Sequence, residues 1–551
     1  MESKSRYNIR LSVACLVILL LTVATLACAS AEPTATAVLP AQPAAPLPSQ
    51  VAPTPTRTLP TATPLVTGKP IYGGTLRVIY PTLDVKTFDP HQSVQVGEVG
   101  PLFAMYNNLV GQQTDDSIAP ELAQSWDISS DGKVVTFHLM KGIKFQDGSP
   151  FNAQAVKAHF DRIMDPNQIS PRKGDLVPPF ERAEVLDENT VAVRLTTSFR
   201  PLLATLSDKA GWIPSPAAIQ KYGKDFGKNP VGTGPFVLKD WRPGGDVLLA
   251  KNDKYWDTGK PYLDTMAFPN VPDIAVSVAM LRTGEADVVT AIDPSLVPTI
   301  SGNTNLNVVK VDTYYFRGFN INPQLQPFNN KLLRQAIAQG VDRDRVIKVV
   351  RSGSGRPAYT PISSAWANDS TVKPMPYDPQ EAKRKLTQAG YPNGVTVPMA
   401  CVATATELQA CEAYQAMLKE VGINTDIKPM PSTDYYGPTG FIVKHGFGAR
   451  GFSPRGDPHI VLALLFFSKG SMNGGLMVNP EADQIIAEAA ATYDLVKARA
   501  LYSKLSVLVA DDAWWTFHYY NVEYIAMNKS VQNYPIYQTH FPRGRFSWFK
   551  N

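Results

Sequence analysis

The residues of this 551-residue chain that could do chemistry do not form the arrangement of a familiar catalyst. The seven histidines stand at positions 91, 138, 159, 445, 459, 518 and 540, and no two of them have the His-Glu-x-x-His spacing of a zinc site. There is no Gly-x-Ser-x-Gly nucleophile turn and no glycine-rich phosphate loop. Paired carboxylates for glycoside hydrolysis stay open, because nothing singles out two acidic residues. These patterns favour a binding protein over an enzyme.

The four cysteines divide between export and folding. Cys15 and Cys28 lie in or beside an apolar N-terminal stretch, which leaves Cys401 and Cys411 in the body of the chain. An even pair in an oxidising compartment predicts a disulfide. Residues 395–401 have the pattern of a strand and 407–421 that of the following helix, so the bridge would join a strand end to the start of a helix. The alternative is two free thiols, one of them buried.

An export signal is predicted at the N-terminus. Lys4, Arg6 and Arg10 precede an almost wholly apolar stretch that ends at Ala27, which is the order found in a secretory signal peptide. Thr25-Leu26-Ala27-Cys28 resembles a lipobox, after which bacterial lipoproteins are cleaved and diacylated on the new N-terminal cysteine. The leucine stands one position closer to the cysteine than the family pattern has it. We therefore expect residues 1–27 to be a signal peptide and Cys28 to be a lipid anchor; the alternatives are an uncleaved anchor and nearby cleavage without lipid.

The segment 28–70 is predicted to be a tether. Ten prolines stand between positions 31 and 70, and Thr and Ala fill most of the other positions. Proline removes backbone donors and favours extended polyproline II, so we expect a semi-rigid spacer. No later apolar run is long enough to cross a bilayer. The protein is thus expected at the outer face of the cytoplasmic membrane, in the periplasm or at the cell surface, attached by lipid and not spanning the membrane.

The body of the chain mixes helical and strand patterns. Hydrophobic residues make up 44% and charged residues 18% of the sequence, which is ordinary for a folded soluble protein. A net charge of only +5 and the lack of a basic cluster argue against a nucleic-acid partner. Strands are predicted at 74–80, 133–139, 191–195, 247–250 and 306–310. Helices are predicted at 152–164 with Asn152 as N-cap, at 274–283, 330–339 and 379–389, and as a pair within 482–510.

Short motifs in a fixed order carry a family resemblance across residues 73–545. The longest is Ala-Pro-Glu-Leu-Ala-Gln-Ser-Trp at 119–126, continued by Lys-Phe-Gln-Asp-Gly at 144–148. The others are Gly73-Gly74-Thr75-Leu76, Thr87-Phe88-Asp89-Pro90, Tyr106-Asn107-Asn108-Leu109-Val110, Gly232-Thr233-Gly234-Pro235-Phe236, Asn252-Asp253-Lys254-Tyr255-Trp256, Gly284-Glu285-Ala286-Asp287 and Arg334-Gln335-Ala336-Ile337 with Val341-Asp342-Arg343. With these motifs the chain resembles the bacterial extracellular solute-binding proteins of family 5, the dipeptide, oligopeptide and nickel type. The motifs identify a scaffold and do not name its ligand.

The resemblance implies an α/β fold of two lobes, the periplasmic-binding-protein-like fold of type II, with an extra subdomain in lobe I and a ligand cleft between the lobes. We expect lobe I at 70–105, 231–315 and 521–551, its inserted subdomain at 106–230, and lobe II at 316–520.

The function implied is that of the extracytoplasmic substrate-binding subunit of an ABC import system. Such a subunit captures a peptide-like or other small organic solute and delivers it to the transmembrane subunits of the permease, and it is expected to be a monomer without a cofactor. The alternative on the same scaffold is a receptor for a metal chelate or haem, or a sensory receptor; a hydrolase is least favoured.

Two segments are expected to hold the ligand. Gln95 and Val96 correspond to the lobe I strip that pairs with the peptide backbone in oligopeptide binders, and residues 448–460 correspond to the lobe II site. Peptide binders have there a Trp followed by an Asp that holds the peptide ammonium. Here Phe452 takes the place of the Trp, and Arg455 that of the Asp; a one-residue shift would put Pro454 there instead.

This departure predicts a ligand with an anionic group. Arg455 would suit a carboxylate or phosphate because its fork of donors fits such groups bidentately; the alternative is a salt bridge to a carboxylate of the lobe. Tyr435 and Tyr436 are expected to supply flat apolar walls. Asp457 lies close by, and Asp457-Pro458-His459 resembles a loop of nickel-chelate binders. Peptide, opine, sugar phosphate and chelate all stay open as ligands, and no residue is assigned to a metal.

Overall fold

The computed structural model describes residues 69–80, 83–176, 179–364, 366–436, 440–452, 456–470, 472–473, 476–539 and 541–550. They belong to one compact unit, Val66–Asn551. The predicted signal peptide, Cys28, nearly all of the tether and Arg455 lie outside the described residues. Within the part of the chain that is described, no helix has the length and apolar character needed to span a bilayer.

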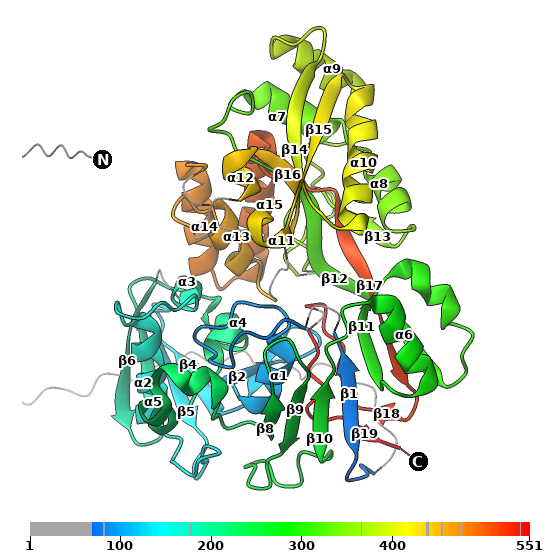
Figure 1. Ribbon diagram of the computed structural model, residues 1–551. Coiled ribbons are helices and arrows are strands. Elements are labelled where there is room, and N and C mark those ends of the chain that lie inside the picture. The colour runs from blue at the N-terminus through cyan, green and yellow to red at the C-terminus, as the bar shows by residue number, and fades with distance from the viewer. Residues whose placement is uncertain are drawn as a thin grey trace, which may run out of the picture. The chain divides into compact units, whose positions relative to one another are not determined.

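One long mixed sheet runs through both lobes (Figure 1). Its strands follow the order β15-β14-β16-β12-β17-β11-β1-β10-β9-β8, and β13 (Gly355–Pro357) attaches to β17. The central pair, β12 (Leu306–Ile321) and β17 (Tyr519–Asn528), is antiparallel and continues from the lower lobe into the upper lobe. The expected two-lobed α/β fold is therefore confirmed. β12 extends well beyond the predicted end at residue 310, because β16 and β17 pair with its second half from both sides.

The lower lobe is built on parallel strands next to this central pair. β1 (Thr75–Ile79) lies parallel to β10 (Thr265–Phe268) and β11 (Val288–Ile292). β8 (Phe236–Trp241) and β9 (Val247–Lys251) extend the sheet in antiparallel fashion. The helices of this lobe are α1 (Val99–Met105), α5 (Pro216–Tyr222) and α6 (Ile274–Thr283). The short strands β18 (Val531–Gln532) and β19 (Trp548–Phe549) pair near the C-terminal end.

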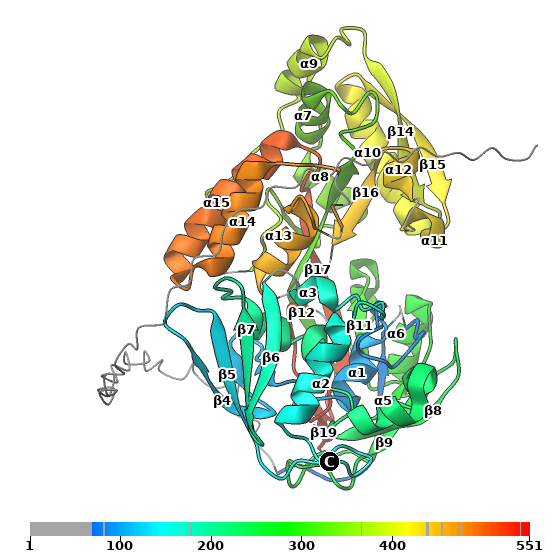
Figure 2. The same cartoon turned by 90° about the vertical axis from the view of Figure 1, so that its left-hand side faces the viewer.

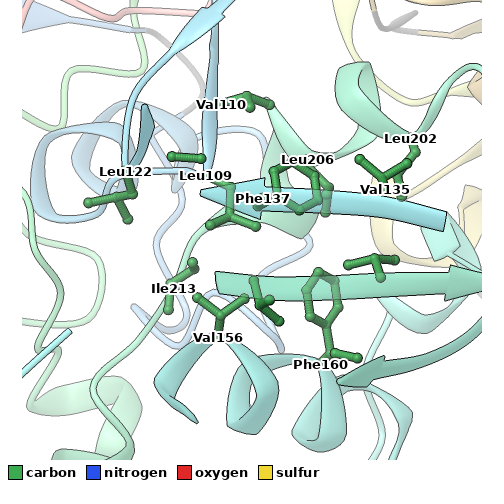
Figure 3. Close-up of a cluster of buried hydrophobic side chains, with 14 of the residues drawn as sticks. Leu109, Val110, Leu122, Val135, Phe137, Val156, Phe160, Leu202, Leu206 and Ile213 are labelled. Atoms are coloured by element: carbon green, nitrogen blue, oxygen red, sulfur yellow. The ribbon is translucent and has the colours of Figure 1, made fainter. Parts of the chain in front are cut away.

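A separate four-stranded sheet lies beside the lower lobe. Its order is β4 (Ala123–Ile128), β5 (Val134–Leu139), β7 (Thr190–Leu195) and β6 (Phe180–Asp187), all antiparallel. Val135 and Phe137 of β5 share one buried cluster with Val156 and Phe160 of α2 (Ala153–Met164), as Figure 3 shows. The predicted N-cap is confirmed, since Asn152 Oδ1 accepts a hydrogen bond from Ala155 N at 3.1 Å. The remaining elements are α3 (Lys173–Leu176), α4 (Leu202–Leu206), β2 (Val110–Gln112) and β3 (Ile118–Pro120).

The upper lobe contains a β-α-β unit. β14 (Val395–Val402) and β15 (Ile423–Met430) are parallel and are joined by α10 (Ala405–Glu420). A disulfide links Cys401 of β14 to Cys411 of α10 with the Cα atoms 6.5 Å apart. β16 (Phe447–Phe452) lies between β14 and β12. The helices are α7 (Lys331–Gln339), α8 (Arg343–Val350), α9 (Pro379–Gln388), α11 (Ser432–Tyr435), α12 (Phe441–Lys444), α13 (Pro458–Phe466), α14 (Pro480–Ala491) and α15 (Leu495–Asp512).

The predicted helices at 152–164, 274–283, 330–339 and 379–389 correspond to α2, α6, α7 and α9, and the predicted pair within 482–510 to α14 and α15. The predicted strands other than β12 also have nearly the expected bounds. α13 and α14 lie directly above α3 and β6 in both views (Figures 1 and 2), so the four-stranded sheet region and the upper lobe face each other there.

Candidate functional site

The lobe I strip is held in place by a buried carboxylate. Glu98 is fully buried, and its Oε1 accepts hydrogen bonds from the backbone N of Lys86 at 2.9 Å and of Thr87 at 3.2 Å. Its Oε2 accepts from Ser93 Oγ at 2.6 Å and from Gln95 N at 3.0 Å. One side chain thus fixes both ends of the loop that contains the predicted contact residues. Sequence reasoning missed Glu98, although its signal was a lone acidic residue at the start of an apolar helix.

Gln95 and Val96 differ in what they can offer to a ligand. Gln95 is half-buried, while Val96 packs against the buried cluster of the lower lobe. Val94, which precedes them, is 55% exposed. The strip can therefore present its backbone and the side chains of Val94 and Gln95, whereas the side chain of Val96 is mainly a packing contact.

β16 carries the lobe II part of the site. Arg450 pairs in register with Gly318, and Phe452 pairs with Phe316 of β12. The Phe452 ring is 6.3 Å from the Phe316 ring, between centroids, and packs against the buried cluster of α13, α14 and α15. Phe452 is half-buried.

The two tyrosines have separate roles in the structure. Tyr435 is only 1% exposed, and its ring stacks on that of Phe441 with centroids 4.3 Å apart. Its hydroxyl donates to Ala449 O at 2.5 Å. Tyr436 is 49% exposed. Tyr436 is therefore accessible to a ligand. Tyr435 instead anchors the end of α11 to β16, because its position on the inner side of that short helix turns it into the core.

Arg450 is a half-buried cation beside Tyr436. Its guanidinium carbon lies 5.8 Å from the centre of the Tyr436 ring, and burial lowers the pKa of Arg450. Among the described residues, its side chain has no hydrogen bond and no acidic partner. The neighbouring Arg317, in contrast, forms an ion pair with Glu407. Sequence reasoning placed the cation at Arg455; the alternation of Gly448, Arg450 and Phe452 on one face of a strand was the signal that pointed to Arg450.

Asp457, an expected ligand contact, instead holds an arginine from the opposite side of the lobe interface. Its carboxylate accepts from Arg200 Nη1 at 2.5 Å and from Arg200 Nη2 at 3.2 Å. It also accepts from His459 N at 2.9 Å, as the N-cap of α13. Arg200 further donates to Tyr502 Oη at 2.9 Å. Three donors occupy the Asp457 carboxylate, which leaves it little capacity for a ligand.

Two further contacts close the same interface. Ser198 Oγ donates to Ala491 O at 3.1 Å, and Arg200 N donates to Ala490 O at 2.8 Å. On the other side, a Cβ atom added to Gly456 would lie 2.2 Å from Gln112 Nε2. The loop before α13 therefore lies against the side chain of Gln112 at the end of β2, which would have to move to admit a larger residue at position 456.

In the described ranges, no group of three or more His, Cys, Asp or Glu side chains is placed to hold a metal ion. His459 of the Asp457-Pro458-His459 sequence packs edge-on against Phe199, with ring centroids 5.1 Å apart. Burial lowers its pKa to about 4. It is thus a neutral, buried ring at neutral pH.

Two lobes joined by the long crossover strands β12 and β17 are the architecture expected of a solute-binding protein. Residues 117–473 match the family model described as "Bacterial extracellular solute-binding proteins, family 5 Middle". The chain belongs to this family, which is one of solute-binding proteins and not of enzymes.

Relatives and solved structures agree with this assignment. The glutathione-binding protein GsiB of Pectobacterium atrosepticum is 32% identical over 425 residues, which cover 75% of this chain and 82% of the relative. The DppA periplasmic binding protein of Helicobacter pylori, solved with the peptide STSA, is 27% identical with a TM-score of 0.80 over 87% of this chain and 99% of that chain. The oligopeptide-binding protein AppA of Bacillus subtilis, solved with a nonapeptide, has a TM-score of 0.77 at 20% identity, over 88% of this chain and 100% of that chain.

Proposed function

We propose that this protein is the lipid-anchored substrate-binding subunit of an ABC importer and that it captures a short peptide-like solute with a free carboxylate, of the glutathione kind. The observation that carries the proposal is Arg450, a half-buried cation without an acidic partner among the described residues, at the end of the strand that bears Phe452. The relatives named for glutathione and the structure solved with a short peptide support the same class of solute.

The chemistry of this site is recognition by charge and shape. An arginine that is partly removed from water gains most from a carboxylate, because charge-assisted hydrogen bonds are about twice as strong as neutral ones. Tyr436 adds an exposed aromatic face next to Arg450. The strip at Val94 and Gln95 is held in place by the hydrogen bond from Gln95 N to Glu98 Oε2, and it presents the exposed side chain of Val94. Arg455 adds a second cation five residues along the chain.

Capture couples binding to the positions of the lobes. The solute contacts both lobes, so it binds the closed arrangement more tightly than the open one and shifts the population toward closure. β12 and β17 are the strands that pass from one lobe to the other. The closed, loaded form is then the one that the permease receives.

Arg450→Gln tests the carboxylate site. We expect calorimetric titration with glutathione to show affinity about 10- to 100-fold weaker than wild type, since a charge-assisted hydrogen bond contributes about 1.5–3 kcal/mol. Arg450→Lys should lose less affinity for glutathione than Arg450→Gln. The exposed Lys444→Gln should bind glutathione like wild type. Arg455→Ala is expected to weaken binding by a similar factor. Unchanged binding by both arginine variants, or capture of a cationic dipeptide in preference to glutathione, would contradict the proposal.

The lipid anchor is tested separately. The apolar stretch that ends at Ala27-Cys28 and the proline-rich tether support attachment at Cys28. Cys28→Ser should abolish labelling with radioactive palmitate and either release the protein from the membrane fraction or leave an uncleaved precursor. Labelling that persists in Cys28→Ser would show that the anchor lies elsewhere.

A further inference from the structure

A second pocket lies apart from the proposed solute site, between the upper lobe and the four-stranded sheet region. Its volume is about 180 Å³. One wall comes from Thr197 and Phe199, after β7, and the other from α13 and α14, through His459, Leu464, Ile486 and Ala487. Gln95, Val96, Tyr435, Tyr436, Phe452 and Asp457 do not line it.

The interior of this pocket is apolar and has the size of one ring. Phe199, Ile460 and Ile486 are buried in its walls, and Leu464 and Phe467 are half-buried there. An apolar protein cavity of about 150 Å³ stays dry and binds benzene. A pocket of about 180 Å³ therefore fits a six-membered ring with one small substituent.

His459 supplies a polar group without a partner. The residue is 8% exposed, and its Nδ1 is buried without a hydrogen bond. Buried polar atoms are nearly always hydrogen-bonded, so such a ring at a pocket wall calls for a ligand group. A neutral imidazole can accept a hydrogen bond from a hydroxyl.

The charged residues at this pocket do not call for an ionic ligand. Asp175 is already bonded to Arg172 at 2.7 Å. Lys469 is exposed at the rim, where water solvates it. The ligand that suits the interior is therefore neutral.

We propose that this pocket binds a neutral single-ring aromatic alcohol, with its ring in the apolar space and its hydroxyl bonded to His459. Both walls must face each other for the ring to be enclosed. Since one wall belongs to each side of the lobe interface, the bound molecule favours the arrangement in which the lobes meet through Arg200 and Asp457. The pocket is thus a second small-molecule site whose occupancy is linked to lobe closure.

Titration of the purified protein with phenol, followed by calorimetry or by ligand-observed NMR, tests the site. Thr197→Phe and Ala487→Phe place a bulky ring at the mouth from the two opposite walls; both positions are exposed, so the core stays intact. Each should weaken phenol binding at least 10-fold. Glu488→Phe adds the same ring at the next residue along α14, which does not line the pocket, and this variant should bind phenol like wild type. Equal phenol affinity in wild type and both blocking variants would overturn the proposal.

The chemistry of the ligand is tested with matched probes. Phenol should bind wild type at least 5-fold more tightly than toluene, and His459→Leu should remove that preference. A preference that survives in His459→Leu would refute the hydrogen bond. Tighter binding of benzoate than of phenol would assign the pocket to acids near Lys469 and overturn the neutral ligand.

Discussion

Asp457 serves two structural purposes with one carboxylate. It caps α13 through His459 N, and it pairs with Arg200 across the lobe interface. The side chains of Arg200 and Asp457 are only 10% and 6% exposed. A buried ion pair costs desolvation when it forms, but removal of one partner leaves the other charge buried and unpaired.

Arg200→Ala should therefore lower the free energy of unfolding by about 3–5 kcal/mol. Asp457→Asn should lower the free energy of unfolding by a similar amount, because it leaves the buried Arg200 without a counter-charge. This variant keeps the N-cap of α13. Asp457→Ala should cost about 1 kcal/mol more than Asp457→Asn, since it removes the cap as well. Urea unfolding followed by circular dichroism measures these differences.

The exposed pair between Arg345 and Glu420 provides the control, with side chains 43% and 51% exposed. Arg345→Ala should change stability by less than about 1 kcal/mol. If Arg200→Ala were no more destabilising than Arg345→Ala, the interlobe pair would not be a structural contact in solution.

This pair also marks the limit of what the sequence could show at the scale of residues. Asp457 lies beside the expected ligand residues, so a ligand role was the natural hypothesis. Its partner Arg200 stands 257 positions away in the chain. The local sequence around either residue does not predict the contact. Glu98 and Arg450 did have local signals, but their roles depend on the backbone groups and rings around them, which those signals do not specify.

Elements with local signals were predictable. The N-terminus of α2 was fixed by Asn152, whose side chain satisfies a backbone donor of the first turn. β12 was predicted too short, because the part that includes Arg317 and Asn320 lacks an apolar alternation and is held by partners on both sides. Strand length in the middle of a sheet is a tertiary property.

The disulfide between β14 and α10 is an element-scale contact with a measurable effect. It closes a short loop, with a sequence separation of 10, and such a link restricts the unfolded chain. Cys401→Ser combined with Cys411→Ser should lower the free energy of unfolding by about 2–3 kcal/mol. A reductant should destabilise the wild type by a similar amount and leave the double variant unchanged. Identical urea midpoints for oxidised and reduced wild type would contradict this.

At the scale of the molecule, the ordered motifs across residues 73–545 carried the family resemblance, and that resemblance implied the two lobes. The solute could not be predicted in the same way. It depends on a few side chains at the end of β16 and in the loop that follows, and these vary while the scaffold stays. We propose, in addition, that the division into lobe I, the inserted subdomain 106–230 and lobe II describes the parts that move; hydrogen exchange with and without solute would show protection concentrated at their boundaries.

Buried histidines set the response of the whole molecule to acid. His91 Nε2 and His159 Nδ1 lie 2.9 Å apart, and His159 Nε2 donates to Ala210 O at 3.0 Å. This chain of bonds requires both rings to be neutral. Burial lowers the pKa of His159 to about 3 and that of His91 well below its usual value.

Because the folded-state pKa of these rings is lower than the unfolded value of about 6.5, the unfolded chain binds more protons in mild acid. The stability that the neutral rings provide is complete above pH 6.5 and is lost as the pH falls toward their folded pKa. Between pH 7 and pH 5, each ring should lower the free energy of unfolding by about 2 kcal/mol. Urea unfolding across this range should show the decline, and His159→Gln should make it shallower. If the free energy of unfolding stayed constant from pH 7 to pH 5, these rings would be protonated in the folded protein as easily as in the unfolded chain.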